Sequence, residues 1–442
     1  MEVSNLTDIK RFLDVEECVR FYPPDIREIV NAEEIFSETD EKKEISVYIH
    51  IPFCKSPCGF CPFNQYRFDE EAFSAYIQSL KKEIDLLKKK ISFSDKTITS
   101  IWIGGGTPLD LSAEQLTDLL SYVSEKFDLS KTEEFTIEGK PVPGMITDEK
   151  LQVLKRYSVT RISLGIQSTH KKYLKLLGRN YTFEQAVEII KKITSYGLKL
   201  NLDMIYHIPG ETEQEIADDV RNISALDVEH ISWFHYISHP GTPLTKKFSD
   251  NNTFISHDNE EFYEKYCLVR DMMEVAGYRQ YTPYYYTLDK ECRYHVDRWR
   301  MPQVDVVGIG SGAFSSYNGW IYSNAHNTDL YIDTVNSGKV PVTKGKKMSR
   351  SDCISRYAVL GCKFFTLDNE NFFRLTGENL CSYFEEKLNI LLQLGLVYVE
   401  NGNIGCTEKG KAFNNAIAMC LSDEKYYSFD QPQPLLIRKE GL

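Results

Sequence analysis

The feature that most constrains the fold is a regular alternation of short β-rich runs and amphipathic stretches from Ser46 onward. Strict alternation of strand and helix predicts βαβ units and a parallel sheet. Helical patterns lie at residues 70–90, 112–127 and 183–197. The predicted strands are SVYIHIPF (46–53), TSIWIGG (99–105), EEFTIEG (133–139), TRISLGIQ (160–167), LKLNLDMIYHI (198–208) and HISWFHYI (230–237). We interpret the strand interiors as apolar on both faces, as a sheet covered by helices requires.

Six strand–helix units are fewer than the eight of a closed barrel, so the fold class is α/β with a partial (βα)6 barrel. A doubly wound sheet is the alternative, and in both architectures ligands bind at the carboxyl ends of the strands. We predict an N-terminal arm over residues 1–44, a barrel core with a closing loop over 45–330, and a lid domain over 331–442. The lid is expected to be mostly helical and winged-helix-like, because a helical stretch leads to a hairpin with Asn401-Gly402 at its turn.

The charge balance excludes several kinds of partner. The formal net charge is -12, and an acidic chain gains nothing from counterion release at a phosphate backbone, so we expect no nucleic acid partner. No apolar run reaches the length of a membrane span. The first twenty residues lack the pattern of a secretory signal, and the eleven cysteines are an odd number. These features predict a cytoplasmic protein with free thiols.

Three cysteines stand within eight residues of each other, directly after the first predicted strand: Cys54, Cys58 and Cys61. Three thiolates on one loop can hold three irons of a cubane cluster and leave the fourth iron open. The amino and carboxylate groups of S-adenosylmethionine (SAM) can chelate an open iron. Zinc is the alternative, but it prefers four protein ligands, and the nearby His50 lies inside the strand. A chance grouping of buried thiols is the remaining alternative.

The sequence Tyr48-Ile-His-Ile-Pro-Phe, followed by the three cysteines with Phe60 before the last, resembles the opening of one branch of the radical SAM superfamily. This is the coproporphyrinogen dehydrogenase-like branch, and the resemblance covers roughly residues 46–420. It implies a 4Fe-4S cluster on the cysteines, and SAM. It also implies that Tyr48 and Phe60 contribute to cofactor binding. In the methylating members of the branch the site holds two SAM molecules.

Gly104-Gly105-Gly106-Thr107-Pro108 ends the second predicted strand, and three glycines let the backbone approach a ligand closely. A tight strand-to-helix turn is the simpler interpretation. The resemblance implies that Gly105 contacts the SAM on the cluster, while Gly106 and Thr107 face the second SAM. Glu138 ends the third strand, and the matching glutamate of the family binds the cluster-bound SAM. A solvated strand-end charge is the alternative for Glu138.

Further positions match those that hold the second SAM. Gln167 ends the fourth strand, Arg179 follows in Leu-Gly-Arg-Asn, and Asp203 lies in Leu-Asp-Met-Ile-Tyr. Charges at Arg179 and Asp203 can pair with a methionine carboxylate and ammonium. Arg179 alone would be interpreted as a helix-end cation, whereas a buried Asp203 needs a partner. Ile237 and Phe314 match apolar positions that pack on SAM, and alone each would be interpreted as core.

A second glycine-rich stretch, residues 308–319, resembles the loop that closes the family's site. Its Ser-Gly-Ala and Asn-Gly pairs, with Ile-Glu-Gly-Lys at 137–140, look closest to anaerobilin synthases, which open haem by radical methyl transfer. Related haem chaperones carry His-Asn-x-x-Tyr-Trp before this loop. The corresponding stretch here, residues 292–299, lacks the asparagine and tyrosine and has its histidine one residue too close to the tryptophan.

Aromatic and histidine side chains near the predicted site offer possible contacts to a flat macrocycle. Tyr281 and residues 284–286 can stack on such a ligand, although they are equally compatible with an ordinary strand. Histidines can ligate haem iron or transfer a proton, although polar residues lining a pocket are the more common case. The candidates are His207, His235, His239 and His295.

The sequence therefore predicts a radical SAM methyltransferase that acts on a tetrapyrrole, with anaerobic haem ring opening as the favoured reaction. Three alternatives stay open: a C-methylase of a quinone or aromatic natural product, an oxygen-independent coproporphyrinogen III dehydrogenase, and a non-catalytic haem chaperone. Pro62 stands where the dehydrogenases have a further cysteine, which counts against that alternative. An electron donor such as a flavodoxin or ferredoxin is expected. No residue is assigned as the catalytic acid, base or hydrogen donor.

Overall fold

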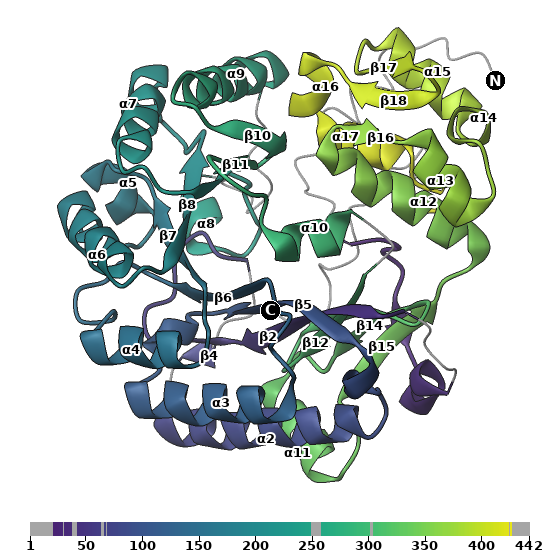
Figure 1. Cartoon of the computed structure of the whole chain (residues 1–442). Coiled ribbons are helices and arrows are strands. Elements are labelled where there is room, and N and C mark those ends of the chain that lie inside the picture. Colours follow the sequence, from purple (N-terminus) through teal and green to yellow (C-terminus); the bar gives the residue numbers. More distant parts are fainter. Residues whose placement is uncertain are drawn as a thin grey trace.

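A thirteen-stranded sheet organises most of the chain (Figure 1). The computed structural model describes residues 21–29, 31–37, 42–62, 66–67, 69–248, 258–300, 304–423 and 425–426. The strand order within the sheet is β1-β15-β14-β13-β12-β2-β5-β6-β7-β8-β9-β11-β10. Because this order has two ends, the sheet forms an open barrel and not a closed one.

The six predicted strands are present and lie side by side in the predicted order. They are β2 (Glu44–Ile51), β5 (Thr97–Gly105), β6 (Glu134–Gly139), β7 (Arg161–Gln167), β8 (Lys199–Tyr206) and β9 (His230–His235). Each pairs in parallel with its neighbour. The prediction of an α/β fold with a partial parallel barrel is confirmed, and all six carboxyl ends meet at one rim.

Antiparallel strands extend both edges of the parallel sheet. A seventh parallel strand, β12 (Asp305–Ile309), pairs with β2 and comes from a segment that the sequence predicts to be loop-rich. On that edge follow β13 (Phe314–Tyr317), β14 (Trp320–Asn324), β15 (Val342–Lys347) and β1 (Arg27–Glu28). On the other edge lie β11 (Tyr285–Thr287) and β10 (Arg279–Thr282). The sequence did not predict β12, because the closely spaced glycines at 308, 310 and 312 are typical of a loop.

Helices cover the outer face of the barrel. The three predicted helices are present as α2 (Glu70–Lys88), α3 (Ala113–Lys126) and α6 (Phe183–Ser195), and further helices were not predicted, among them α8 (Pro243–Phe248), α11 (Thr328–Asn336) and four others. The four others are α4 (Asp148–Arg156), α5 (Lys171–Leu176), α7 (Glu213–Ser224) and α9 (Asn259–Val275). Capping boxes begin α3 at Ser112 and α6 at Thr182, and each cap contributes about 1 kcal/mol. Among the described residues no helix is long and apolar enough to cross a membrane.

The inner face of the barrel is polar, so the expectation that the strands are apolar on both faces was wrong. Side chains alternate between the two faces of a strand, and the isoleucines, leucines and valines point outward to the helices. Several inward-facing residues are buried and carry a hydroxyl or an amide group: Ser46, Ser100, Thr136, Ser163, Asn201 and Ser232. A barrel whose interior carries hydrogen-bonding groups can hold a polar ligand at its rim.

A short helix, α10 (Arg293–Trp299), packs against the barrel strands between the sheet and the C-terminal helices (Figure 1). Asp297 anchors it, because its carboxylate accepts hydrogen bonds from Thr99 at 2.7 Å and Ser100 at 2.8 Å on β5. Tyr294 stacks on Trp102 of β5, with ring centroids 5.0 Å apart. The segment that carries the divergent chaperone-like stretch therefore belongs to the closing structure of the barrel.

A mostly helical unit with a small sheet follows, as predicted. Its elements are α12 (Arg350–Gly361), β16 (Thr366–Leu367), α13 (Asn369–Thr376), α14 (Leu380–Tyr383), α15 (Glu385–Gln393), β17 (Val397–Glu400), β18 (Asn403–Cys406), α16 (Glu408–Ala412) and α17 (Asn414–Cys420). The β17–β18 hairpin turns at Asn401 and Gly402, both with positive φ. The boundaries at residues 44 and 330 stay predictions, while the barrel's sheet continues to Lys347.

One buried carboxylate ties the glycine-rich loop to α2. Glu83 accepts hydrogen bonds from the Gly310 N–H at 2.8 Å, the Asn324 amide at 2.7 Å and the Tyr331 hydroxyl at 2.5 Å. Burial raises the pKa of Glu83 to about 7, and the three donors only partly offset that effect. The Glu83 carboxyl therefore keeps its proton to a higher pH in the folded protein than an exposed glutamate does.

We expect Glu83→Gln to change how the stability depends on pH. The folded pKa lies above the unfolded one, so the folded state binds the extra proton and the contribution of Glu83 is lost as pH rises from about 4.5 to 7. The free energy of unfolding of the parent protein, relative to the variant, should fall by about 2–3 kcal/mol between pH 5 and pH 8. Urea denaturation of the cluster-free proteins measures it. The exposed Glu188→Gln is the control, and a similar pH dependence in both variants would contradict the assignment.

Candidate cofactor and active site

The three cysteines lie on one loop at the carboxyl end of β2. Cys54 ends β3 (Phe53–Cys54) and is fully buried, Cys58 is buried, and Cys61 is half-buried. The loop is fixed at several points by the surrounding barrel. The Gly59 N–H donates to the Leu177 carbonyl at 3.2 Å, and the Gly59 carbonyl accepts from Leu244 N–H at 2.8 Å. The sequence alone predicted where this loop begins, but not what holds it.

Lys140 lies beneath the same loop. Its ammonium donates to the Ser56 carbonyl at 2.7 Å, and the side chain is buried. Burial raises the pKa of the Cys54 thiol, while Lys140 and the Thr107 hydroxyl work against that rise. A cation next to a buried thiol favours its thiolate form, which is the form that binds metal. Lys140 was noted in the sequence only as part of a family likeness.

The Gly-Gly-Gly-Thr loop runs directly against the cysteine loop. The N–H groups of Gly106 and Thr107 donate to the carbonyls of Ile51 at 2.8 Å and Phe53 at 2.9 Å. A Cβ on Gly106 would stand 2.4 Å from the Phe53 carbonyl oxygen, so only glycine fits at this position. The Thr107 hydroxyl lies 3.2 Å from the Cys54 sulfur. Thr107 is thus placed beside the first cysteine of the loop.

Glu138 projects into the barrel at the end of β6, under the same glycines. Its carboxylate accepts from the Trp102 indole at 2.6 Å and from the Gly105 N–H at 3.1 Å. A Cβ on Gly104 would stand 2.5 Å from that carboxylate. Burial raises the pKa of Glu138 to about 7. Trp102, which the sequence reading missed, fixes the orientation of Glu138.

Tyr48 and His50 lie beside this carboxylate on β2. The Tyr48 hydroxyl lies 2.8 Å from His50 Nδ1, and burial lowers the pKa of His50 to about 4. His50 is therefore neutral near pH 7, and it shares a hydrogen bond with the Tyr48 hydroxyl. Gly105 has φ +113°, and a Cβ there would lie 2.6 Å from the imidazole. His50 points into the barrel, beside Tyr48 and Gly105, and is therefore not placed as a fourth zinc ligand.

Arg179 is buried beside the cysteine loop, and its guanidinium lies 5.6 Å from the centre of the Phe60 ring. Among the described residues, its Nε and Nη1 atoms have no hydrogen-bond partner. Burial opposes its charge, but Tyr181, the cysteine thiols and Asp203 outweigh that effect and raise the pKa of Arg179. A buried cation with unused donors is costly unless an anionic ligand completes it.

Asp203 faces the same part of the barrel interior from β8. It accepts from the Ser163 hydroxyl at 3.0 Å and the Asn201 amide at 2.8 Å. Burial raises the pKa of Asp203, and those donors together with Arg179 oppose the rise. Gln167, with φ +74°, donates to the Asp203 carbonyl at 3.4 Å. Gln167, Arg179 and Asp203 are thus brought together at the carboxyl ends of β7 and β8.

Two predicted apolar positions lie elsewhere on the rim. Ile237 is half-buried just after β9. Phe314 on β13 stacks on Phe21, with ring centroids 4.2 Å apart and an interplanar angle of 19°. The N-terminal segment therefore covers one face of Phe314, which the sequence did not indicate.

The proposed stacking surface for a macrocycle is occupied by protein. Tyr281, Tyr284, Tyr285, Tyr286 and His295 are all buried. Tyr285 stacks on His295 with centroids 4.0 Å apart, and both pack on Trp299. These rings offer no open surface, so the alternative of ordinary strand residues applies to the tyrosines on β10 and β11. Tyr281, Tyr284 and Tyr285 belong to the core between the barrel edge and the C-terminal unit, and Tyr286 belongs to the core of the barrel. His207 and His235 are likewise buried, and His207 Nε2 lies 3.4 Å from a Glu261 oxygen.

The residues present fit the predicted cofactors. Within the described part of the chain no three metal-binding side chains gather around one point. A cubane bonds each thiolate to a different iron, so three cysteines on one loop can supply the ligands of three irons. Arg179, beside the cysteine loop, supplies two buried donors that have no hydrogen-bond partner among the described residues.

Comparison with known proteins agrees with this geometry. Residues 48–223 match the Radical SAM superfamily. A haem chaperone, HemW of Haemophilus influenzae, is 31% identical over 274 residues, which are 61% of this chain and 69% of the relative. The anaerobilin synthase of Escherichia coli O157:H7 is 27% identical over 313 residues, 70% of this chain and 69% of the relative.

A solved structure, coproporphyrinogen III oxidase (HemN) from Escherichia coli, superposes with a TM-score of 0.77 at 23% identity and covers 90% of this chain and 95% of its own. The chain belongs to the radical SAM superfamily, in the branch with the coproporphyrinogen III oxidase fold. Membership implies a 4Fe-4S cluster and SAM as cofactors.

We expect Cys54→Ala, Cys58→Ala and Cys61→Ala each to abolish the cluster and all SAM cleavage, since no spare thiol lies on the loop. Iron and acid-labile sulfide per chain, measured after anaerobic reconstitution, check this. Cys381→Ala, in the C-terminal unit, is the matched control and should keep the full cluster content. A Cys58→Ala protein with an intact cluster spectrum would refute the ligand assignment.

Proposed function

We propose that the protein is a radical SAM methyltransferase that uses two SAM molecules and acts on a tetrapyrrole, with anaerobic haem ring opening as the favoured reaction. When bound, the cluster and SAM supply reductive SAM cleavage, an organic radical and a transferable methyl group. The chain's own residues bind and orient these groups and exclude water. An electron donor such as a flavodoxin or ferredoxin, and a cytoplasmic location, are part of the proposal.

The observation that carries the proposal is the Arg179–Asp203 arrangement. A cation with two unused donors and an anion face the same part of the barrel, near the cysteine loop. The amino acid end of SAM carries a carboxylate and an ammonium, which match these charges in sign. Because the SAM on the open iron already uses its amino acid end there, a separate charged pair supports a second SAM. Gln167, Ile237, Gly106 and Thr107 would complete that second site.

Glu138 and Gly105 serve the SAM on the cluster in this proposal. The carboxylate is held rigidly by Trp102 and Gly105, so it can accept hydrogen bonds from a ribose without reorganising. Tyr48 and Phe60 would line the same pocket. Because the pKa of Glu138 is about 7, hydrogen bonds donated by a ligand would favour its ionised form.

A tetrapyrrole substrate is supported by the relatives. One curated relative is an anaerobilin synthase and another is a haem chaperone, and the solved structure is a coproporphyrinogen III oxidase. The Ser-Gly-Ala and Asn-Gly pairs in the loop at residues 308–319 and the Ile-Glu-Gly-Lys sequence at 137–140 favour the first of these. The closing loop is held by Glu83 beside the cysteine loop's strand, where it can cover a substrate.

A haem chaperone is the second candidate, because curated haem chaperones match this chain at up to 31% identity. One observation weighs against it. His295, in the stretch corresponding to the chaperone motif, is buried and stacked on Tyr285, and burial holds its pKa well below the usual range. It is not presented to a haem iron. A methylase of a quinone or an aromatic natural product would use the same charged pair, Arg179 and Asp203. The haem turnover experiment below distinguishes it from a haem-opening enzyme.

We expect Arg179→Ala and Asp203→Ala to spare the cluster and to reduce methyl transfer at least about tenfold, since each removes a charge-assisted hydrogen bond worth about 1.5–3 kcal/mol. Formation of S-adenosylhomocysteine should fall while 5′-deoxyadenosine persists. Arg156→Ala, an exposed cation at the end of α4, is the control. Unchanged methylation in both variants would make these residues purely structural.

Turnover with haem tests the reaction. The reduced, cluster-loaded protein with SAM and haem should bleach the Soret band, release iron and form S-adenosylhomocysteine and 5′-deoxyadenosine. Mass spectrometry should find a linear tetrapyrrole carrying the transferred carbon. Haem that survives many SAM cleavages would shift the assignment to the small-molecule methylase, and haem binding without any SAM cleavage would favour the chaperone.

A further inference from the structure

A continuous chain of buried hydrogen bonds leads away from Asp203 across the barrel interior. Asn201 donates from Nδ2 to Asp203 Oδ1 at 2.8 Å and to the Ser163 hydroxyl at 2.7 Å. Ser163 in turn donates to Asp203 Oδ2 at 3.0 Å. Both carboxylate oxygens of Asp203 are therefore bonded by groups that Asn201 holds in place.

His230, the first residue of β9, fixes Asn201 from the other side. Its Nδ1 lies 2.6 Å from Asn201 Oδ1, and its Nε2 lies 2.7 Å from the Tyr281 hydroxyl. The amide oxygen can only accept, so Nδ1 carries a proton. Burial lowers the pKa of His230 well below its usual range, and nearby Arg161 and His295 add to that effect. The ring is neutral, and its Nε2 accepts the Tyr281 proton.

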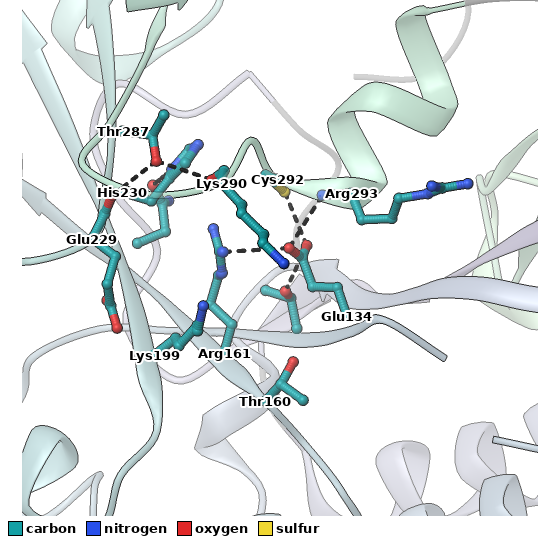
Figure 2. Close-up of polar contacts among 12 residues, drawn as sticks. Glu134, Thr160, Arg161, Lys199, Glu229, His230, Thr287, Lys290, Cys292 and Arg293 are labelled. Carbon is teal, nitrogen blue, oxygen red and sulfur yellow. Dashed lines mark hydrogen bonds and ion pairs between the residues drawn. The ribbon is translucent and has the colours of Figure 1, made fainter. Parts of the chain in front are cut away.

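The far end of the chain is anchored on the segment that closes the barrel. The Cys292 N–H donates to the Tyr281 hydroxyl at 3.3 Å. The Cys292 thiol and the Arg293 N–H donate to Glu134 at 2.9 Å and 3.2 Å, and Glu134 also pairs with Arg161 at 3.4 Å (Figure 2). Helix α10 begins at this anchor, so the chain joins α10 to the interior of β8.

Every hydrogen bond in the chain points the same way. From the Cys292 N–H through Tyr281, His230 and Asn201, each group donates to the next and the last donates to the Asp203 carboxylate. Aligned donors in a buried network polarise one another and stabilise negative charge at the end that only accepts. Reversing the Asn201 amide would set its carbonyl oxygen against the Asp203 carboxylate, so the arrangement in which the NH2 group faces Asp203 is favoured.

We propose that Asn201, His230 and Tyr281 are positioning residues that hold the Asp203 carboxylate as an oriented anion for the cationic end of the second SAM. This inference rests on the proposed function, because it takes Asp203 as a ligand of that SAM. It adds that the site is completed from the β10 edge of the sheet and from the start of α10. None of the three side chains touches the SAM itself.

Tyr281→Phe tests the proposal with the smallest change, since only the hydroxyl is removed. We expect the second SAM to bind roughly fivefold more weakly, as for the loss of one buried hydrogen bond, and Asn201→Leu to approach the effect of Asp203→Asn. Equilibrium dialysis of SAM against the cluster-loaded protein measures binding and stoichiometry. The ratio of S-adenosylhomocysteine to 5′-deoxyadenosine measures methyl transfer. A second readout is pH: in Tyr281→Phe and Asn201→Leu the binding of the second SAM should require a higher pH, because Asp203 is then less stabilised as an anion.

Tyr286→Phe is the matched control. Tyr286 is as deeply buried on the next strand, but its hydroxyl bonds to Gln280 and not to the chain. If Asp203→Asn abolishes second-SAM binding while Tyr281→Phe and Asn201→Leu behave like Tyr286→Phe, the positioning role is overturned and the proposed function stands. If Asp203→Asn itself changes neither stoichiometry nor methyl transfer, the proposed function fails with it.

A measurement on the unaltered protein keeps the proposal falsifiable if a variant does not fold. Nitrogen-15 spectra of histidine-labelled protein, assigned with His230→Gln, should show His230 protonated at Nδ1 and unprotonated at Nε2 from pH 5 to pH 8. A proton on Nε2, or a charged ring within this range, would overturn the directed chain.

Discussion

The close passage of two loops at one rim of the barrel governs the rest of the site. The backbone of Gly106 lies so near Phe53 that a Cβ would stand 2.4 Å from the carbonyl oxygen, and the N–H groups of this loop satisfy carbonyls of the cysteine loop. Because a β-carbon at that point would push the loops apart, the positions of the cysteines and of Glu138 depend on the same contact. The Gly-Gly-Gly-Thr loop and the cysteine loop therefore form a single packed unit.

The barrel separates its two faces by polarity. Aliphatic side chains pack outward on the helices, whereas serines, a threonine and Asn201 form a hydrogen-bonding layer inside. Such a layer is tolerated only when each group has a partner. Asp297 on α10 and the donors around Asp203 provide many of these partners, so the helix that closes the barrel also satisfies its interior.

The sequence predicted the six parallel strands and the cysteine loop, because both are local signals: a repeated pattern and a spacing. It missed β12, since pairing in parallel with β2 is a long-range event and its glycines resemble a turn. It misjudged the strands as apolar on both faces, although Ser163, Asn201 and Ser232 occupy alternate positions that could have indicated a polar interior. It also treated Tyr285 and His295 as ligand contacts, because residue type does not reveal that two rings stack on each other. The roles of Arg179, Asp203 and Glu138 stay predictions.

The rings that join the barrel edge to the C-terminal unit have a consequence for how the chain can be divided. Tyr281, Tyr284, Tyr285 and Trp299 share one core with α12 and α17, and Tyr22 from the N-terminal segment enters the same cluster. A chain ending before Arg350 would leave a broad aromatic surface facing water. Large exposed apolar patches promote self-association. The barrel therefore needs the C-terminal unit to cover this aromatic surface, and we expect a barrel produced without it to self-associate.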